Sequence, residues 1–115
     1  MKKLFASVPM RGRTEEAIRK SMEKMKRIAE AFEGEELELI DTYMDLDIPK
    51  GSNAGLLYLA KSIELLSTAD VFIGVEYASM FPGCESELKA ARDYGIDYHV
   101  VQLREIVEEW DLVEI

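Results

Sequence analysis

The chain has 115 residues, 48% of them hydrophobic, and a formal net charge of −9. This length suits one domain with a single core, which we expect to span residues 1–115. The acidic balance argues against the clusters of Lys and Arg that sequence-independent phosphate binding needs, so no nucleic acid polymer is expected as a partner.

Targeting signals and metal-site patterns are both missing from the sequence. The apolar run that begins at Leu4 stops at Arg11 without a small-residue cleavage site, so we expect neither export nor a membrane partner. The single cysteine excludes an internal disulfide and fits a reducing compartment. One cysteine and one histidine do not supply the usual ligands of a zinc site. We therefore expect a cytoplasmic protein with no metal and no cofactor.

The apolar residues alternate between strand and helix patterns along the chain. Four strands are predicted, at residues 3–8, 37–41, 71–75 and 98–103. Four helices are predicted, at about residues 14–34, 54–68, 82–94 and 104–110. Such alternation predicts an α/β fold, a flavodoxin- or Rossmann-like three-layer sandwich with a mainly parallel sheet of four to five strands.

Local signals support the helix boundaries. Thr14 is a suitable N-cap for the first helix, Gly34 ends it, and Gly95 is a C′ residue for the third. Two apolar stripes are expected to pack on the sheet. The first contains Ile18, Met22, Met25, Ala29 and Phe32, and the second contains Leu56, Leu59, Ala60, Ile63 and Leu66.

The loop after the first strand, Pro9-Met10-Arg11-Gly12, joins that strand to a helix. Free backbone N–H groups and the positive helix end at such a junction favour an anion, and Arg11 would add donors. Neither a dinucleotide-binding nor a P-loop glycine pattern is present, so an arginine that only solvates the loop stays the alternative. In a strand order of 2-1-3-4 this loop would face the turn before the third helix.

Two carboxylates in the first turn of the third helix, Glu85 and Glu87, differ in their neighbours. Glu85 precedes Lys89 by four residues, the favourable order for a surface ion pair. Glu87 shares its helix face with Ala90, Ala91 and Tyr94. Its carboxylate should therefore point at the strand ends, where the positive helix terminus would keep it ionised. The alternative to a catalytic role is a glutamate that only compensates the helix dipole.

Three other residues have side chains that could take part in catalysis or bind a ligand, but the sequence pattern favours a structural or solvated role for each. Cys84 lies in the first turn of a helix, but no histidine is arranged beside it, so we interpret it as a small buried residue. His99 is interpreted as a structural histidine within a strand. Asp70 begins the third strand at the amino end of the sheet, where a solvated role is expected.

Three segments together resemble the DUF4406 family of small, mostly phage and bacterial proteins, within the nucleoside 2-deoxyribosyltransferase-like superfamily. They read LFASVPMRG at residues 4–12, LLSTADV at 65–71 and GCESE at 83–87. The resemblance covers the first strand with its loop and then about residues 57–101, while the intervening segment matches only in layout.

The resemblance implies a hydrolase or transferase that cleaves the N-glycosidic bond of a nucleoside or nucleotide, or transfers its deoxyribosyl group. Glu87 matches the glutamate that attacks the anomeric carbon and forms a covalent glycosyl-enzyme intermediate. Asp70 is carried over as a catalytic support residue, and Arg11 as the contact to a 5′-phosphate. The substrate-binding residues implied are Phe5, Ser7, Pro9, Met10, Arg11, Gly12, Tyr77, Gly83 and Cys84.

The chain departs from this pattern at positions that matter for catalysis. Phe5 stands where these enzymes often have a tyrosine. Pro82 stands where they carry an aspartate, which leaves the acid that protonates the leaving base unidentified. The alternative to catalysis is therefore a non-catalytic module that binds a nucleotide-like ligand through the same pocket.

Self-association is also expected. Related transferases complete their sites with a neighbouring subunit, and the apolar tail at residues 110–115 suggests unsatisfied surface. We therefore expect a homodimer or a higher homo-oligomer.

Overall fold

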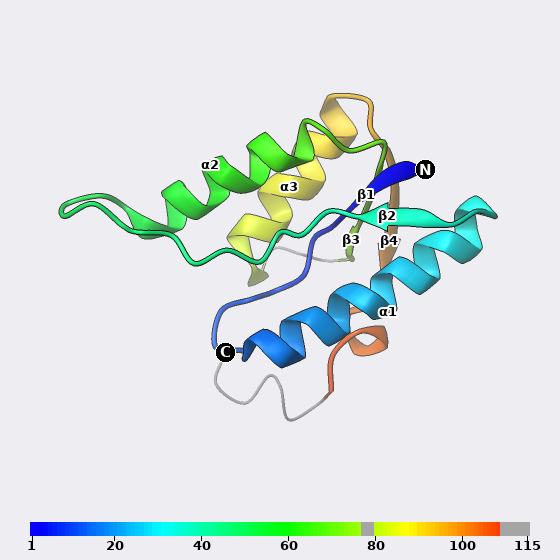
Figure 1. Cartoon of the computed structure of the whole chain (residues 1–115), viewed down its shortest axis with the longest axis horizontal. Coiled ribbons are helices and arrows are strands. Elements are labelled where there is room, and N and C mark those ends of the chain that lie inside the picture. Colours follow the sequence, from blue (N-terminus) through cyan, green and yellow to red (C-terminus); the bar gives the residue numbers. More distant parts are fainter. Residues whose placement is uncertain (77–79, 109–115) are drawn as a thin grey trace.

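A parallel sheet forms the centre of the protein, whose computed structural model describes residues 1–76 and 80–108 (Figure 1). Its strands are β1 (Lys2–Ala6), β2 (Leu37–Leu39), β3 (Val71–Val75) and β4 (Asp97–Val101). They lie in the order β2-β1-β3-β4, and every neighbouring pair is parallel. The predicted α/β class, the parallel sheet and the 2-1-3-4 order are confirmed.

Helices cover both faces of this sheet. They are α1 (Glu15–Glu33), α2 (Ala54–Leu66) and α3 (Pro82–Asp93). Figure 1 shows α1 on one side of the strands and the neighbouring pair α2 and α3 on the other, which gives the three predicted layers. A single 3₁₀ turn at Leu103–Glu105 follows β4 in place of the helix expected at 104–110. Residues 109 and 110 lie outside the described residues.

The helix ends follow the local signals in the sequence. The Thr14 hydroxyl accepts a hydrogen bond from the Ala17 backbone N–H at 3.1 Å, which satisfies one free donor at the start of α1. Gly34 ends α1 with a positive φ of 72°, a conformation that costs glycine little. Gly95, after α3, has a φ of 78°. The three predicted capping positions are confirmed.

The strand alternation divides the core between the two faces. Leu4 and Ile73 point to the side of α1, where they join the buried Met22 and Met25. Phe5 and Phe72 point to the other side, where their rings stack with centroids 5.8 Å apart. Both aromatic side chains are almost completely buried, so this stack is part of the core between the sheet and α3.

The two predicted stripes are only partly buried. In α1, Phe32 is 61% exposed, because it lies at the end of the helix beside His99 at the edge of the sheet. In α2, Leu66 is buried, whereas Leu56 is 63% and Ile63 36% exposed. The reason is that α2 packs mainly on α3 and less on the strands, so part of its apolar face is left without cover.

None of the helices in the described part of the chain combines the length and the apolar character that a bilayer crossing requires. This finding concerns residues 1–76 and 80–108.

Candidate functional site

Ser7 and Glu87 form a buried pair where the first and third strands end. Ser7 follows β1 directly, and its backbone N–H donates to the Ile73 carbonyl at 2.9 Å, which extends the pairing of β1 with β3 by one residue. Its hydroxyl donates to Glu87 Oε1 at 2.7 Å. Ser7 is 2% exposed and Glu87 9% exposed. The two residues are 80 positions apart in the chain, so only the fold brings them together.

The local sequence explains why Glu87 points inward. Pro82 occupies the first turn of α3, where its missing N–H costs no hydrogen bond. The buried positions of this helix are Cys84, Glu87 and Ala91, which recur at steps of three and four and so share one face. Glu85 lies on the exposed side, as expected.

Burial dominates the electrostatics of Glu87. It raises the pKa of this carboxyl, because a charged carboxylate loses its hydration when it is buried. Hydrogen bonds from Ser7 and then from Ser62 of α2 act in the opposite direction, since they stabilise the ionised form. The net pKa is raised, whereas the sequence pattern predicted that the helix terminus would favour ionisation.

Cys84 lies beside this pair but is not an activated thiol. Burial raises its pKa to about 12, and the neighbouring Glu87 carboxylate acts in the same direction. Ser7, through a hydrogen bond, and Arg13, through its charge, oppose that shift. A thiol with such a pKa is almost entirely protonated at neutral pH and is a poor nucleophile. This agrees with the interpretation of Cys84 as a small buried residue.

The loop after β1 is held by Arg13. Its guanidinium donates to the Pro9 carbonyl at 2.7 Å, to the Ala17 carbonyl at 3.2 Å and to the Ser21 hydroxyl at 2.6 Å. Ser21 in turn donates to the Ile106 carbonyl at 2.6 Å. Arg13 therefore fastens the loop to α1, which itself is joined to the segment after β4.

The other predicted loop residues differ in exposure. Pro9 is buried, and Met10 is half-buried against the core. Arg11 and Gly12 are exposed, and Gly12 has a positive φ of 74°. Arg11 is thus open to a ligand in solution.

Two predicted site residues lie away from the Ser7–Glu87 pair. Asp70 precedes β3 at the opposite edge of the sheet, where its Oδ2 accepts from the Lys3 backbone N–H at 2.8 Å. The five residues of β3 lie between Asp70 and the carboxyl edge of the sheet, a distance of about 16 Å. Phe5 is 1% exposed in its stack with Phe72, so its ring is not accessible to a substrate. In this structure Asp70 and Phe5 stabilise the sheet, Asp70 through its hydrogen bond to the backbone of β1 and Phe5 through its packing in the core.

The remaining predictions concern α3 and the turn before it. Gly83 is exposed in the first turn of α3. The expected pair of Glu85 with Lys89 is wrong, because Lys89 pairs with Asp93, one turn further along the helix. Tyr94, expected on the inner face, is 86% exposed because it follows the last helical residue. Tyr77 lies outside the described residues.

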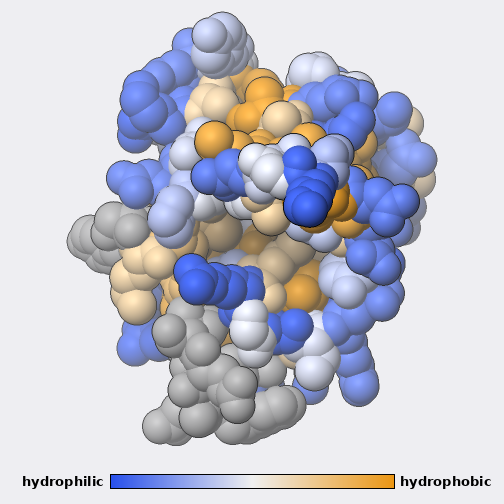
Figure 2. Space-filling model, turned by 90° about the vertical axis from the view of Figure 1, so that its left-hand side faces the viewer, coloured by the Kyte–Doolittle hydropathy of each residue, from blue (hydrophilic) through white to orange (hydrophobic). Residues whose placement is uncertain are grey.

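One face of the molecule is hollowed. The start of α3 and the loop between β1 and α1 lie toward the left of Figure 1, and Figure 2 looks onto that side. Its centre is a depression with a largely apolar floor and hydrophilic side chains around the rim (Figure 2). An apolar hollow with a few polar groups is the usual form of a small-molecule site.

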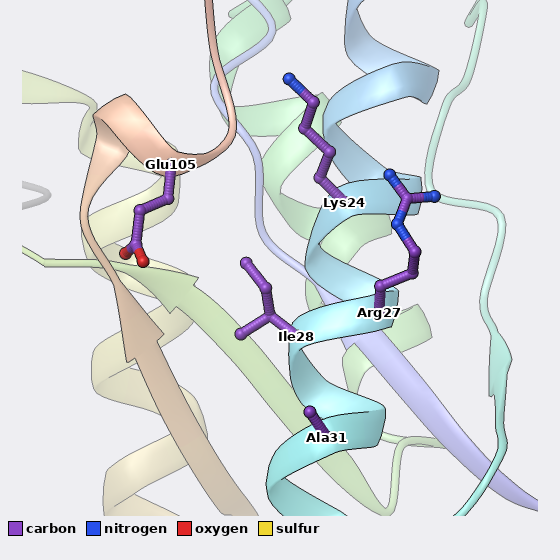
Figure 3. Close-up of a pocket in the computed structure, with 5 residues that line it drawn as sticks. All are labelled: Lys24, Arg27, Ile28, Ala31 and Glu105. Carbon is purple, nitrogen blue, oxygen red and sulfur yellow. The ribbon is translucent and has the colours of Figure 1, made fainter.

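A second hollow, of about 340 Å³, lies between α1 and the 3₁₀ turn after β4 (Figure 3). Four of its lining residues come from α1 and one from the 3₁₀ turn, namely Lys24, Arg27, Ile28, Ala31 and Glu105. Lys24 is paired with Glu108 at 3.3 Å. This hollow is wide open and does not include the buried carboxyl, so we do not place the site there.

Two residues of the site were missed by the sequence analysis. Ser62 is one polar residue among the apolar positions of α2, and that contrast was the available signal. The sequence analysis named Arg11 and not Arg13, because nothing in the local sequence indicates which of the two arginines points inward. Its partner Ser21 lies eight residues away on α1, two turns along the helix.

Comparisons with known proteins support the fold and do not bear on the function. No protein-family model matches the chain, and no curated protein matches it. Among solved structures, the chain is similar to a conserved protein from Enterococcus faecalis V583, with a TM-score of 0.56 and 17% sequence identity. The match covers 87% of this chain and 62% of that one. The resemblance to the DUF4406 family accordingly stays a prediction.

Proposed function

We propose that the protein cleaves the N-glycosidic bond of a nucleoside or nucleotide, or transfers its sugar, with Glu87 as the nucleophile. The observation that carries this proposal is the buried 2.7 Å hydrogen bond from Ser7 to Glu87 between the ends of β1 and β3. These are the strands between which the strand order reverses, where α/β sheets bind their ligands. The resemblance of the surrounding motifs to the deoxyribosyltransferases supplies the reaction class.

In the proposed reaction, a Glu87 carboxylate oxygen forms a bond to C1′ of the sugar. The bond from C1′ to the base breaks, and the base leaves with the electron pair and takes up a proton. Water or a second base then attacks C1′ and releases Glu87, as in double displacement by retaining glycosidases. Ser7 would act as a positioning residue that fixes one oxygen of the carboxylate, so that the other is directed at the sugar.

Asp70 has no part in this mechanism, because it lies at the amino edge of the sheet. Arg11, exposed on the loop after β1, is proposed to contact a 5′-phosphate. That contact would favour nucleotides over nucleosides, and Arg11→Ala would then weaken binding of the nucleotide alone.

The experiment is a comparison of wild type with Glu87→Gln and Glu85→Gln. The proteins are incubated with a panel of nucleosides and 5′-nucleotides, and released base is measured by chromatography. We expect Glu87→Gln to abolish release, because the amide keeps the shape but is not a nucleophile, and Glu85→Gln to change little. Mass spectrometry of the acid-quenched wild type should detect the glycosyl adduct. Equal release by wild type and Glu87→Gln would refute the catalytic role.

A second candidate function is a non-catalytic module that binds a nucleotide-like ligand. The observation that favours it is the burial of Glu87, which is 9% exposed. Burial raises the pKa of this carboxyl and so favours its neutral form, which is a hydrogen-bonding group and not a nucleophile. Retained nucleotide binding by calorimetry, without base release by wild type, would support this function over catalysis.

We also propose that the protein is a homo-oligomer, at least a dimer. The support is the uncovered apolar face of α2, where Leu56 is 63% and Ile63 36% exposed. The tail at residues 110–115, which was expected to pair with another chain, lies outside the described residues.

A further inference from the structure

A second group of ionisable side chains lies at the opposite end of the sheet from Glu87. Glu33 is the last residue of α1, and Asp97 and His99 are the first and third residues of β4. Asp97 and His99 are two positions apart, so they project from the same face of the strand. His99 Nε2 lies 2.6 Å from Glu33 Oε2, and one ligand atom from each of the three residues falls within 4.8 Å of the others.

The charge of this cluster is poorly balanced. The Glu33 side chain is 10% exposed and lies at the carboxyl end of α1, where the helix dipole disfavours a negative charge. The last turn of α1 contains no basic residue. Lys2 Nζ forms ion pairs with Glu33 at 3.9 Å and with Glu35 at 3.8 Å, but the Lys2 side chain is 51% exposed and both distances are too long for hydrogen bonds, so it offsets only part of the negative charge. Asp97 adds a further carboxylate, so a cation at this place would lower the electrostatic free energy.

The imidazole is held in a fixed orientation. The ring of Phe32 stacks on the ring of His99 with centroids 4.9 Å apart and planes 7° from parallel. This contact explains why a large apolar side chain stays 61% exposed at the end of α1. A ring that is already fixed loses less conformational entropy when its nitrogen binds an ion.

We propose that Glu33, Asp97 and His99 form a site for a divalent transition-metal ion of the Zn²⁺ type, separate from the Ser7–Glu87 pair. One imidazole and two carboxylates are a ligand set that suits such an ion, and water would fill the open position. The ligand atoms of a tetrahedral Zn²⁺ site are roughly 3.3 Å apart, so the ion would replace the direct contact of His99 with Glu33 after a small opening of that pair. It would fasten the end of α1 to the edge strand β4.

The full-length protein allows a direct test, because His99 is its only histidine. The C2 and C4 protons of a single imidazole give unambiguous NMR signals, which are followed while ZnCl₂ is added in a non-chelating buffer. We expect both signals to shift or broaden and to saturate at one equivalent of Zn²⁺, and calorimetry to give the same stoichiometry. A Zn²⁺-dependent rise in the melting temperature should accompany binding, since the unfolded chain lacks the site.

Three variants separate this site from general binding to an acidic surface. Asp97→Asn and Glu33→Gln should each weaken Zn²⁺ binding by roughly tenfold or more, because each removes one ligand. Glu36→Gln is the matched control, since it removes an exposed carboxylate close to the same end of α1 without removing a ligand. Asp97 is also exposed, so Asp97→Asn provides the test even if Glu33→Gln does not fold.

Cys84→Ser excludes binding to the thiol, which is buried in another part of the molecule. We expect this variant to bind Zn²⁺ like the wild type. An absence of His99 shifts with Zn²⁺, or equal weakening by Asp97→Asn and Glu36→Gln, would overturn the proposal.

Discussion

Glu87 binds a proton more tightly in the folded protein than in the unfolded chain, because burial raises its pKa. It therefore contributes stability that is fully present below the unfolded pKa of about 4.3 and is lost as pH rises through the folded pKa. Glutamine stays neutral throughout. We predict that the stability of Glu87→Gln relative to wild type increases from about pH 4 to pH 8, measured by urea unfolding at several pH values. A relative stability that falls with pH would contradict the direction of the shift.

Ser7 should lower the pKa of the same Glu87 carboxyl. Its hydrogen bond favours the ionised form, so Ser7→Ala should raise the pKa of Glu87 further. The measurement is ¹³C NMR of the glutamate side chains as a function of pH, with Glu87→Gln used to assign the signal. If the protein is an enzyme, the acidic limb of its pH–rate profile should move to higher pH as well. The control is Ser86→Ala, which changes an exposed serine on α3. It should leave the pKa of Glu87 and the acidic limb of the pH–rate profile unchanged.

At the scale of residues, the sequence predicted the inward position of Glu87 and the outward position of Glu85. Both followed from the spacing of small and charged neighbours along one helix. The partners of Glu87 were harder to predict, because Ser7 and Ser62 lie in other elements and meet it only through the fold. The Glu33–His99 pair was missed for the same reason, since its members are 66 positions apart.

In β3, Gly74 makes room for a ring of the core. A Cβ at this position would lie 2.7 Å from Cε1 and 3.0 Å from Cζ of Phe72. The Phe72 ring cannot move away easily, because it is fully buried and stacked on Phe5. We predict that Gly74→Ala lowers the free energy of unfolding by about 1–3 kcal/mol, measured with urea.

Gly83 provides the matched control for this substitution. A Cβ there meets nothing within 4 Å, and the residue lies in helix α3, where alanine is favoured over glycine. Gly83→Ala should therefore leave stability unchanged or raise it by up to about 1 kcal/mol. A Gly74→Ala protein as stable as Gly83→Ala would show that the ring adapts at no cost.

At the scale of elements, the caps and the central strand were predicted closely, because they depend on neighbouring residues. Thr14, Gly34 and Gly95 each act within one turn of the helix end that they define. Burial of the helix stripes was overestimated, since it depends on where each helix sits on the sheet. The exposed residues of α2 are apolar in sequence, and only its placement against α3 shows that they are left uncovered.

The uncovered face of α2 leads to a prediction for the whole molecule. We expect light scattering at micromolar protein concentration to give at least twice the chain mass of 13.1 kDa. Leu56→Lys should reduce the mass to that of one chain, because a charge in an apolar interface is costly. Tyr94→Lys, at an exposed aromatic residue after α3, is the control and should keep the oligomer. A wild type with the mass of one chain would refute self-association.

The central place of β1 in the sheet has a consequence for how the chain folds during synthesis. β1 is synthesised well before its neighbour β3, since Lys3 and Asp70, which are hydrogen-bonded in the folded protein, are 67 positions apart. Until then β1 can pair only with β2, and its other edge stays open to a second nascent chain. Because most strand pairs join distant parts of the sequence, folding should be slow for a chain of this size. We therefore expect the chain to be more prone to aggregate between the synthesis of β2 and of β3 than after β3 has paired with β1.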